Sequence, residues 1–68
     1  MYFPRIKDTR EDQDKTQKEI ADLLYITQQQ YSLYECGKRE IPVSYLCTLA
    51  KFYGVSADYL LGLTDAKK

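Results

Sequence analysis

The chain has 68 residues, 44% of them hydrophobic and 29% charged, which suffices for one domain but leaves little room for a buried catalytic cleft beside a core. Ten basic residues balance ten acidic ones, and this zero net charge argues against the basic surface typical of nonspecific nucleic-acid binding. There is no histidine, no apolar N-terminal run of the secretory type and no stretch of ~20 apolar residues that could span a membrane, so we expect a cytoplasmic, non-enzymatic protein without cofactors or membrane contact.

Apolar residues recur at helical spacing along most of the chain, and no segment shows the alternation and turn residues of a β-hairpin. The sequence therefore predicts an all-α domain over residues 1–68, with a core over about 4–63 and a loose tail at 64–68. Its five short helices are predicted over about residues 4–12, 17–24, 28–36, 43–53 and 57–61.

The first helix begins at Pro4, because proline is tolerated at the first helical position. Its inward positions are expected to be Ile6, Thr9, Arg10 and Gln13. Only one of these side chains is strongly apolar, so this helix presents a weakly apolar face to the core.

The most informative segment runs from Thr16 to Lys38 and is predicted to form two short helices joined by a tight turn. Thr16 and Thr27 each precede a helix and can cap it, because a threonine oxygen accepts a hydrogen bond from a free amide of the first turn. The inward apolar positions are Ile20, Ala21, Leu24, Ile26, Tyr31 and Tyr34. The positions at the start and on the free side of the second helix are Gln28, Gln29, Gln30, Ser32 and Leu33.

The run of glutamines has two interpretations. Glutamine can make a bidentate pair with adenine in the major groove of DNA, and the same run taken alone is also compatible with a polar helix face in solvent. Gly37 ends the helix, because glycine accepts the left-handed conformation that follows many helices. Lys38 and Arg39 then form a local basic pair that can meet phosphate or lie in solvent.

The two C-terminal helices are each followed by a glycine, Gly54 and Gly62. Ser56 can cap the last helix. The inward positions of the helix over 43–53 are Leu46, Leu49, Ala50 and Tyr53. Since several of the tyrosines fall at inward positions, core packing explains them better than stacking on single-stranded bases does.

Cys36 and Cys47 both fall within predicted helices, and nothing indicates a secreted protein, so we expect free thiols rather than a disulfide. Two thiols without histidine also do not supply a usual four-ligand zinc site. The acidic pair Asp12 and Asp14 is expected in a solvated loop, because neither histidine nor an enclosing cleft accompanies it.

Several short motifs occur in order and at matching spacing between residues 5 and 65. They are Arg5-Ile6-Lys7, Thr16-Gln17 with Glu19-Ile20-Ala21, Ile26-Thr27, Tyr31-Ser32-x-Tyr34-Glu35, Gly37-Lys38-Arg39 with Pro42, Leu49-Ala50-Lys51 with Tyr53-Gly54-Val55-Ser56, and Asp58-Tyr59-Leu60-Leu61-Gly62. Each motif is weak alone. Together they resemble the Xre family, the Cro or phage-repressor type of helix-turn-helix domain, which places its second helix in the major groove of DNA.

The resemblance implies that the helix over 17–24 crosses the DNA backbone and that the helix over 28–36 is the recognition helix. The implied base contacts are Gln28, Gln29, Ser32 and Leu33, the last suited to a thymine methyl group. The implied backbone contacts are Gln17, Gln30, Lys38 and Arg39. Tyr45 is added because it begins the next helix near the basic pair, where its hydroxyl can reach a phosphate or lie at the surface. Phosphate contacts fix the register of the protein on DNA, and base contacts give the sequence preference.

The resemblance also assigns structural and assembly roles. Arg10 and Glu35 match positions that form a buried ion pair in similar repressors, and Tyr59 and Leu63 become candidates for dimer contacts. The implied function is a sequence-specific transcriptional regulator, a repressor, that binds double-stranded DNA as a homodimer on a pseudo-palindrome. No small-molecule effector is evident from the sequence.

Some positions depart from the family pattern. Thr9 and Lys15 stand where leucine is usual, and Tyr25 stands where glycine or asparagine is common, at a cost of roughly 1 kcal/mol if its backbone is left-handed. Glu40 beside the basic pair weakens a phosphate contact there. With the zero net charge and an expected apolar spot at Leu23 and Tyr25, these departures favour an alternative. It is a protein-interaction module of the same fold, such as an antitoxin or anti-repressor subunit, that needs a partner.

Overall fold

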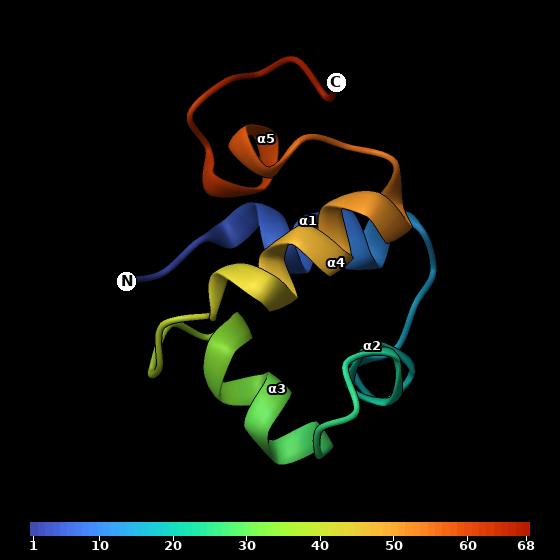
Figure 1. Ribbon diagram of the computed structural model, residues 1–68. Helices are drawn as coiled ribbons and strands as arrows, with labels where there is room; N and C mark the ends of the chain where they lie inside the picture. Colours follow the sequence, from blue (N-terminus) through green and yellow to red (C-terminus); the bar gives the residue numbers. More distant parts are fainter.

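The computed structural model describes residues 1–68, which form five helices and no strand. In chain order these are α1 Pro4–Asp12, α2 Gln17–Leu23, α3 Gln28–Glu35, α4 Val43–Tyr53 and α5 Ala57–Leu61 (Figure 1). The predicted all-α, five-helix architecture is confirmed. The only boundaries that differ are the ends of α2 and α3, where Leu24 and Cys36 are cap residues and not the last helical ones.

Threonine side chains begin both α2 and α3. The Thr16 hydroxyl accepts a hydrogen bond from the Glu19 amide at 3.1 Å, and the Glu19 carboxylate accepts one from the Thr16 amide at 3.1 Å. Thr27 and Gln30 repeat this reciprocal arrangement at the start of α3, at 3.1 and 3.3 Å. Each capping box satisfies two amides that the helix itself cannot, and an N-cap residue contributes about 1 kcal/mol.

One apolar cluster forms the core, with members from all five helices or their caps. Its buried side chains are Ile6, Ile20, Ala21, Leu24, Tyr31, Leu46, Leu49, Ala50, Tyr53 and Leu60. Of the positions predicted to face inward around the α2–α3 turn, Ile26 and Tyr34 are only half-buried. The prediction that Gln13 faces inward is wrong, because Gln13 is the C-cap of α1 and is exposed. Only its side-chain amide reaches the rest of the domain, where it donates to the Tyr53 carbonyl at 3.0 Å.

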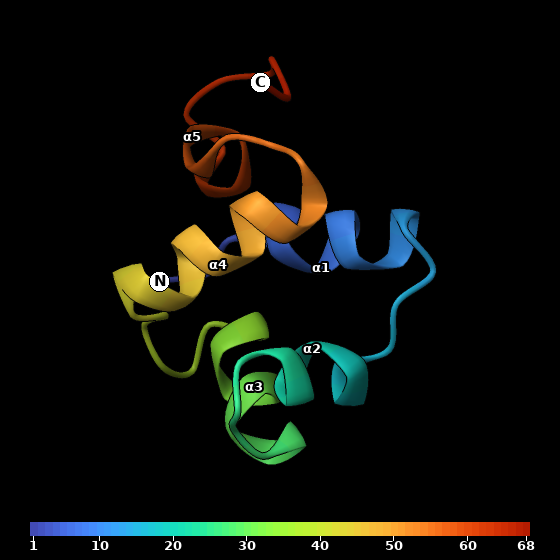
Figure 2. The ribbon, with the colours of Figure 1, turned by 45° about the vertical axis from the view of Figure 1, so that its right-hand side comes forward.

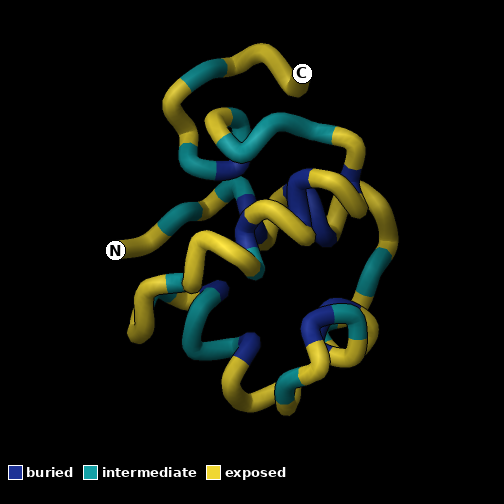
Figure 3. The backbone as a smooth tube through the Cα atoms, in the orientation of Figure 1, coloured by how far each residue is buried: buried dark blue, intermediate teal, exposed yellow.

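The helices are arranged in two groups. α2 packs against α3 at one end of the molecule, whereas α5 packs against α1 and α4 at the other (Figures 1 and 2). Buried residues lie on the faces that the helices turn toward one another, while the α2–α3 turn and the start of α3 are exposed (Figure 3). None of the helices is long and apolar enough to cross a membrane.

Left-handed backbone occurs at two informative places. Gly37, with φ +81°, follows α3, and a side chain there would come within 2.9 Å of the Tyr2 backbone, so both conformation and space require glycine. Tyr25, in the α2–α3 turn, has φ 58° and is 95% exposed. The expected strain at Tyr25 is therefore present, and no packing of its ring offsets it.

The C-terminal tail 64–68 contains no helix but contacts the rest of the domain. The guanidinium of Arg5 donates to the Thr64 carbonyl and forms an ion pair with Asp65. The Ser56 amide donates to the Lys67 carbonyl at 2.6 Å. These contacts with Arg5 of α1 and with Ser56, the N-cap of α5, hold the tail in an arch over α5 (Figure 1).

Candidate nucleic-acid interface

An open hollow lies between α2 and α3, and we call it the recognition hollow. It is lined by Gln17, Gln28, Gln29, Ser32 and Leu33. The fold thus brings together on one surface the four residues predicted to contact bases and one residue predicted to contact the backbone. Gln28 and Gln29 are exposed, whereas Ser32 and Leu33 are half-buried one turn further along α3.

The cap of α3 positions the glutamines. Because Thr27 caps the helix, Gln28 and Gln29 stand in its first turn, and the fully buried Tyr31 ring fixes which face of α3 is turned inward. The side chain of Gln30 is only partly available to a ligand, because its oxygen already accepts a hydrogen bond from the Thr27 amide at 3.3 Å. No intramolecular hydrogen bond occupies the side-chain amides of Gln28 and Gln29, so both can serve as donor and acceptor to a ligand.

A buried ion pair lies beneath this surface. Arg10 Nε donates to Glu35 Oε2 at 2.9 Å, and Arg10 Nη2 donates to Glu35 Oε1 at 3.0 Å. Arg10 Nη1 also donates to the Lys15 carbonyl at 2.6 Å. The pair links α1 to α3, and Gln17 joins it from α2, because its side-chain amide donates to Glu35 Oε1 at 3.2 Å.

The surroundings of the pair keep both groups charged. Burial acts to raise the pKa of Glu35, but the hydrogen bonds and positive charge of Arg10, with a smaller contribution from Gln17, act in the opposite direction, and the pKa lies below its ordinary value. The hydrogen bond to Glu35 raises the pKa of Arg10. Burial also raises the pKa of the Tyr31 and Tyr53 hydroxyls, which are enclosed near the pair without a hydrogen-bond partner.

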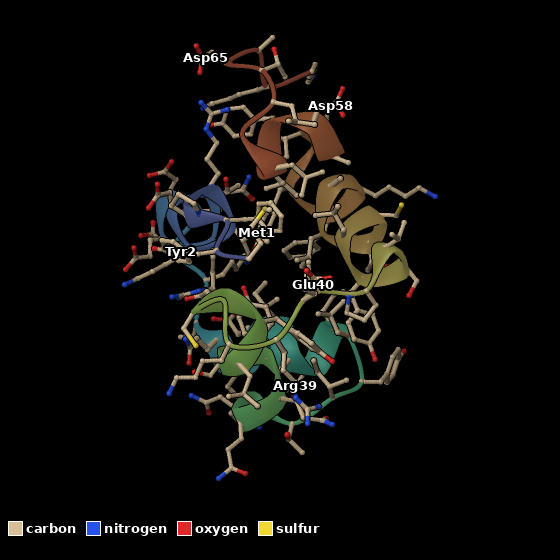
Figure 4. The ribbon with its side chains drawn as sticks, turned by 90° about the vertical axis from the view of Figure 1, so that its left-hand side faces the viewer. Met1, Tyr2, Arg39, Glu40, Asp58 and Asp65 are labelled. Carbon is tan, nitrogen blue, oxygen red and sulfur yellow. The ribbon has the colours of Figure 1, made fainter.

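The basic pair lies in the loop after α3. Lys38 and Arg39 are exposed, and the Arg39 amide donates to the Leu33 carbonyl at 3.1 Å, which folds the loop back onto the end of α3. Glu40 follows them but forms no ion pair with either cation. Arg39 and Glu40 extend to different sides of the loop, with Arg39 toward α3 (Figure 4).

Tyr45, in the first turn of α4, is half-buried. Its ring contacts Tyr34 edge-on, with ring centroids 5.9 Å apart and an interplanar angle of 69°. Packing therefore explains the position of the Tyr45 ring. If Tyr45 contacts a phosphate, it does so through its hydroxyl group.

The two residues predicted for dimer contacts lie apart from the recognition hollow. Tyr59 is half-buried in α5, with the Arg5 guanidinium 4.5 Å from its ring centroid. Leu63, just after α5, is 73% exposed. Because α5 lies at the opposite end of the molecule from α3 (Figure 2), the predicted residues divide into two separate surfaces.

Sequence reasoning missed one residue near this interface. Lys7 of α1 lines a second hollow together with Gln17, Glu35 and Cys36. It stands three positions before Arg10, and residues at this spacing lie on the same face of a helix. This spacing could have been used to predict that Lys7 lies beside the ion pair. The two thiols, Cys36 and Cys47, are exposed and free, as predicted.

Comparison with known proteins agrees with this geometry. Residues 6–60 match the helix-turn-helix family. The chain is 37% identical over 65 residues to the uncharacterized HTH-type transcriptional regulator YobD of Bacillus subtilis (strain 168), which covers 96% of this chain and 58% of YobD. It is 40% identical over 67 residues to the SPbeta prophage-derived regulator YonR of the same organism, covering 98% of this chain and 62% of YonR.

The HTH-type transcriptional regulator ImmR of Bacillus subtilis (strain 168) is 39% identical over 64 residues, which cover 94% of this chain and 50% of ImmR. The chain thus spans between half and about three-fifths of the length of these relatives. No solved structure matches it significantly. The match to the family covers most of the domain, and the chain belongs to the helix-turn-helix family.

Proposed function

We propose that this chain is a sequence-specific transcriptional regulator, a repressor, that binds double-stranded DNA and reads the major groove with α3. The observation that carries the proposal is the exposed pair Gln28 and Gln29, whose amides are free at the start of a helix whose other face is buried. A glutamine amide matches the donor and acceptor that adenine presents in the major groove. Ser32 and Leu33 extend the same face by one turn.

The residues around α3 supply backbone contacts in this proposal. Lys38 and Arg39 provide charge after α3, the side-chain amides of Gln17 and Gln30 provide directional donors, and the Tyr45 hydroxyl adds a neutral one. Such contacts set the register of the protein on the duplex but do not read its sequence. These cations give the surface around α3 a local positive charge that attracts phosphate, although the net charge of the chain is zero.

A dimer is the second element of the proposal. Two copies related by a twofold axis would place two recognition helices in successive major grooves, with half-sites about 10 bp apart on a pseudo-palindrome. Tyr59 and Leu63 are the proposed contacts, because Leu63 is an apolar side chain that is 73% exposed and a second copy would remove it from water. Their distance from the recognition hollow leaves α3 free for DNA.

Selection from a random duplex pool at about 50 and 200 mM salt tests the proposal. We expect enrichment of one short palindrome, with affinity that falls steeply as salt rises. Sedimentation of the complex then gives the number of chains per duplex, and a monomeric complex contradicts the dimer. No enrichment at either salt concentration overturns the proposed DNA readout.

One observation favours a second function, a protein-interaction module of the same fold, such as an antitoxin or anti-repressor subunit. Tyr25 is 95% exposed in a left-handed conformation, where a glycine would be less strained. An aromatic ring held out in this way is suited to a protein partner, since tyrosine is enriched at interfaces. Loss of partner binding by Tyr25→Gly, with DNA selection negative, would favour this function over the first.

A further inference from the structure

A second open hollow adjoins the recognition hollow, and we call it the lateral hollow. Its volume is about 350 Å³, and it is lined by Tyr2, Lys7, Gln17, Glu35 and Cys36 at the junction of α1, α2 and α3. Gln17 lines both hollows. A DNA backbone that follows the edge of the recognition surface at Gln17 therefore meets the lateral hollow next.

Lys7 is the only cation among the residues that line the lateral hollow. It is exposed and takes part in none of the three ion pairs of the domain. The only carboxylate that lines the hollow is Glu35, and its charge is matched by Arg10 through two hydrogen bonds of 2.9 and 3.0 Å. One free ammonium beside a neutralised carboxylate suits a single anionic group, such as a phosphodiester.

Gln17 supplies a donor of fixed orientation. Its side-chain nitrogen donates one hydrogen to Glu35 Oε1 at 3.2 Å. Because Glu35 is a carboxylate and can only accept, the contact requires the nitrogen of the Gln17 amide, not its oxygen, to face inward. Glu35 is 3% exposed and held by Arg10. The second hydrogen of the Gln17 nitrogen stays free for another acceptor at the rim of the hollow.

We propose that Lys7 and Gln17 together bind a DNA backbone phosphate in the lateral hollow, and that Glu35 is a positioning residue that orients the Gln17 amide for this contact. The inference rests on the proposed DNA binding and extends it to α1, which carries no other assigned contact. Lys7 contributes a positive charge, and Gln17 contributes a hydrogen-bond donor of fixed orientation. The buried ion pair affects DNA binding only through Gln17, because it does not contact DNA itself.

The first test compares Lys7→Ala with Lys51→Ala, an exposed lysine of α4 that lines neither hollow. Binding is measured on the selected duplex and on a scrambled duplex between about 50 and 200 mM salt. We expect Lys7→Ala to weaken both complexes about five- to ten-fold at 0.1 M salt and to reduce the salt slope by about 0.9, the value for one phosphate contact. Lys51→Ala should leave affinity and slope unchanged.

The outcomes separate this inference from the function on which it rests. If Lys38→Ala weakens binding while Lys7→Ala leaves affinity and slope at their wild-type values, the lateral site is wrong and the proposed function stands. If the wild-type chain binds neither duplex, both fall together.

The second test addresses the positioning role of Glu35. Arg10→Met/Glu35→Leu replaces the buried pair by apolar side chains, which a core tolerates far better than one unpaired charge. We expect Gln17→Ala to weaken binding about ten-fold in the wild-type chain, as for loss of a charge-assisted hydrogen bond, but less than about two-fold in the double variant. An equal loss in both backgrounds contradicts the positioning role.

A measurement on the unaltered chain covers the case in which the double variant does not fold. The side-chain amide of Gln17 gives its own proton–nitrogen signals in NMR spectra, assigned by their loss in Gln17→Ala. Titration with the selected duplex should shift these signals, whereas those of Gln13, which donates to the Tyr53 carbonyl, should not move. Unmoved Gln17 signals at saturating duplex overturn the proposed phosphate site.

Discussion

Arg10 and Glu35, 25 positions apart in the chain, form a two-point ion pair that connects α1 directly to α3. Few apolar contacts connect α1 to α3, because Ile6 is the only apolar residue of α1 in the buried core. The pair therefore holds the recognition helix against the N-terminal helix at a place where packing is sparse. Gln17 extends the same network to α2, so three helices share one carboxylate.

Removal of one partner of this pair should unfold much of the protein. Arg10→Ala leaves a buried carboxylate unpaired, and Glu35→Ala leaves a guanidinium unpaired, at a cost of about 3–5 kcal/mol in the free energy of unfolding. The double variant Arg10→Met/Glu35→Leu should be about as stable as the wild type. Urea titrations followed by far-UV circular dichroism measure all three. Single variants within 1 kcal/mol of the wild type would refute this energetic account.

The lowered pKa of Glu35 predicts loss of stability in acid. A carboxyl group whose pKa is lower in the folded than in the unfolded state stabilises the fold above its unfolded pKa, near 4.5. That contribution disappears as the pH falls through the lower, folded pKa. We therefore expect the melting temperature to drop below about pH 4.5 in the wild type. Arg10→Met/Glu35→Leu should show a smaller drop, and an identical drop would assign the effect to other carboxyl groups.

The two free glutamines of α3 should determine base preference. Gln28→Ala or Gln29→Ala is expected to cost about 1–3 kcal/mol on the selected duplex and to relax the preference at one base pair. Affinity for scrambled duplexes should hardly change, because backbone contacts persist. A panel of single-base operator variants measures this. If both variants rank the panel as the wild type does, α3 does not read bases through these amides.

Lys38 should behave differently from the glutamines. Lys38→Ala removes an exposed cation that is in no ion pair, so it should weaken binding to all duplexes alike and reduce the salt slope by about one. Titrations at several salt concentrations provide the slope. The neighbouring substitution Glu40→Gln should have the opposite effect and raise the affinity for DNA, since it removes a negative charge beside the basic pair. A change in base preference by Lys38→Ala would contradict the assignment.

Local chemistry explains why most of the fold could be predicted from the sequence. Thr16 and Thr27 mark the helix starts because their side chains satisfy amides within the same turn. Gly37 marks the end of α3 because left-handed backbone favours glycine. Such features depend on residues three or four positions apart, which a sequence displays directly.

The arrangement of the interface depends on contacts between distant residues and was less predictable. The hydrogen bond between Gln17 and Glu35 joins residues 18 positions apart, on a carboxylate that Arg10 also holds from a third helix. Lys7 reaches the same surface only through the packing of α1 against α3. Likewise, the tail contacts of Arg5 follow from the docking of α5 on α1.

Tyr25 provides a test in which stability and function should separate. Its left-handed backbone costs roughly 1 kcal/mol and its ring is exposed, so Tyr25→Gly relieves strain without losing packing. The greater freedom of glycine in the unfolded chain offsets about 0.4–1 kcal/mol of this gain, so we expect stability to rise by about 0.6 kcal/mol at most. Asp14→Gly, at φ 56°, is the matched control and should gain less, because aspartate tolerates this conformation better than tyrosine does. Urea titration measures both. A fall in stability for Tyr25→Gly would mean that the ring makes a stabilising contact in solution, as a second copy or a protein partner would provide.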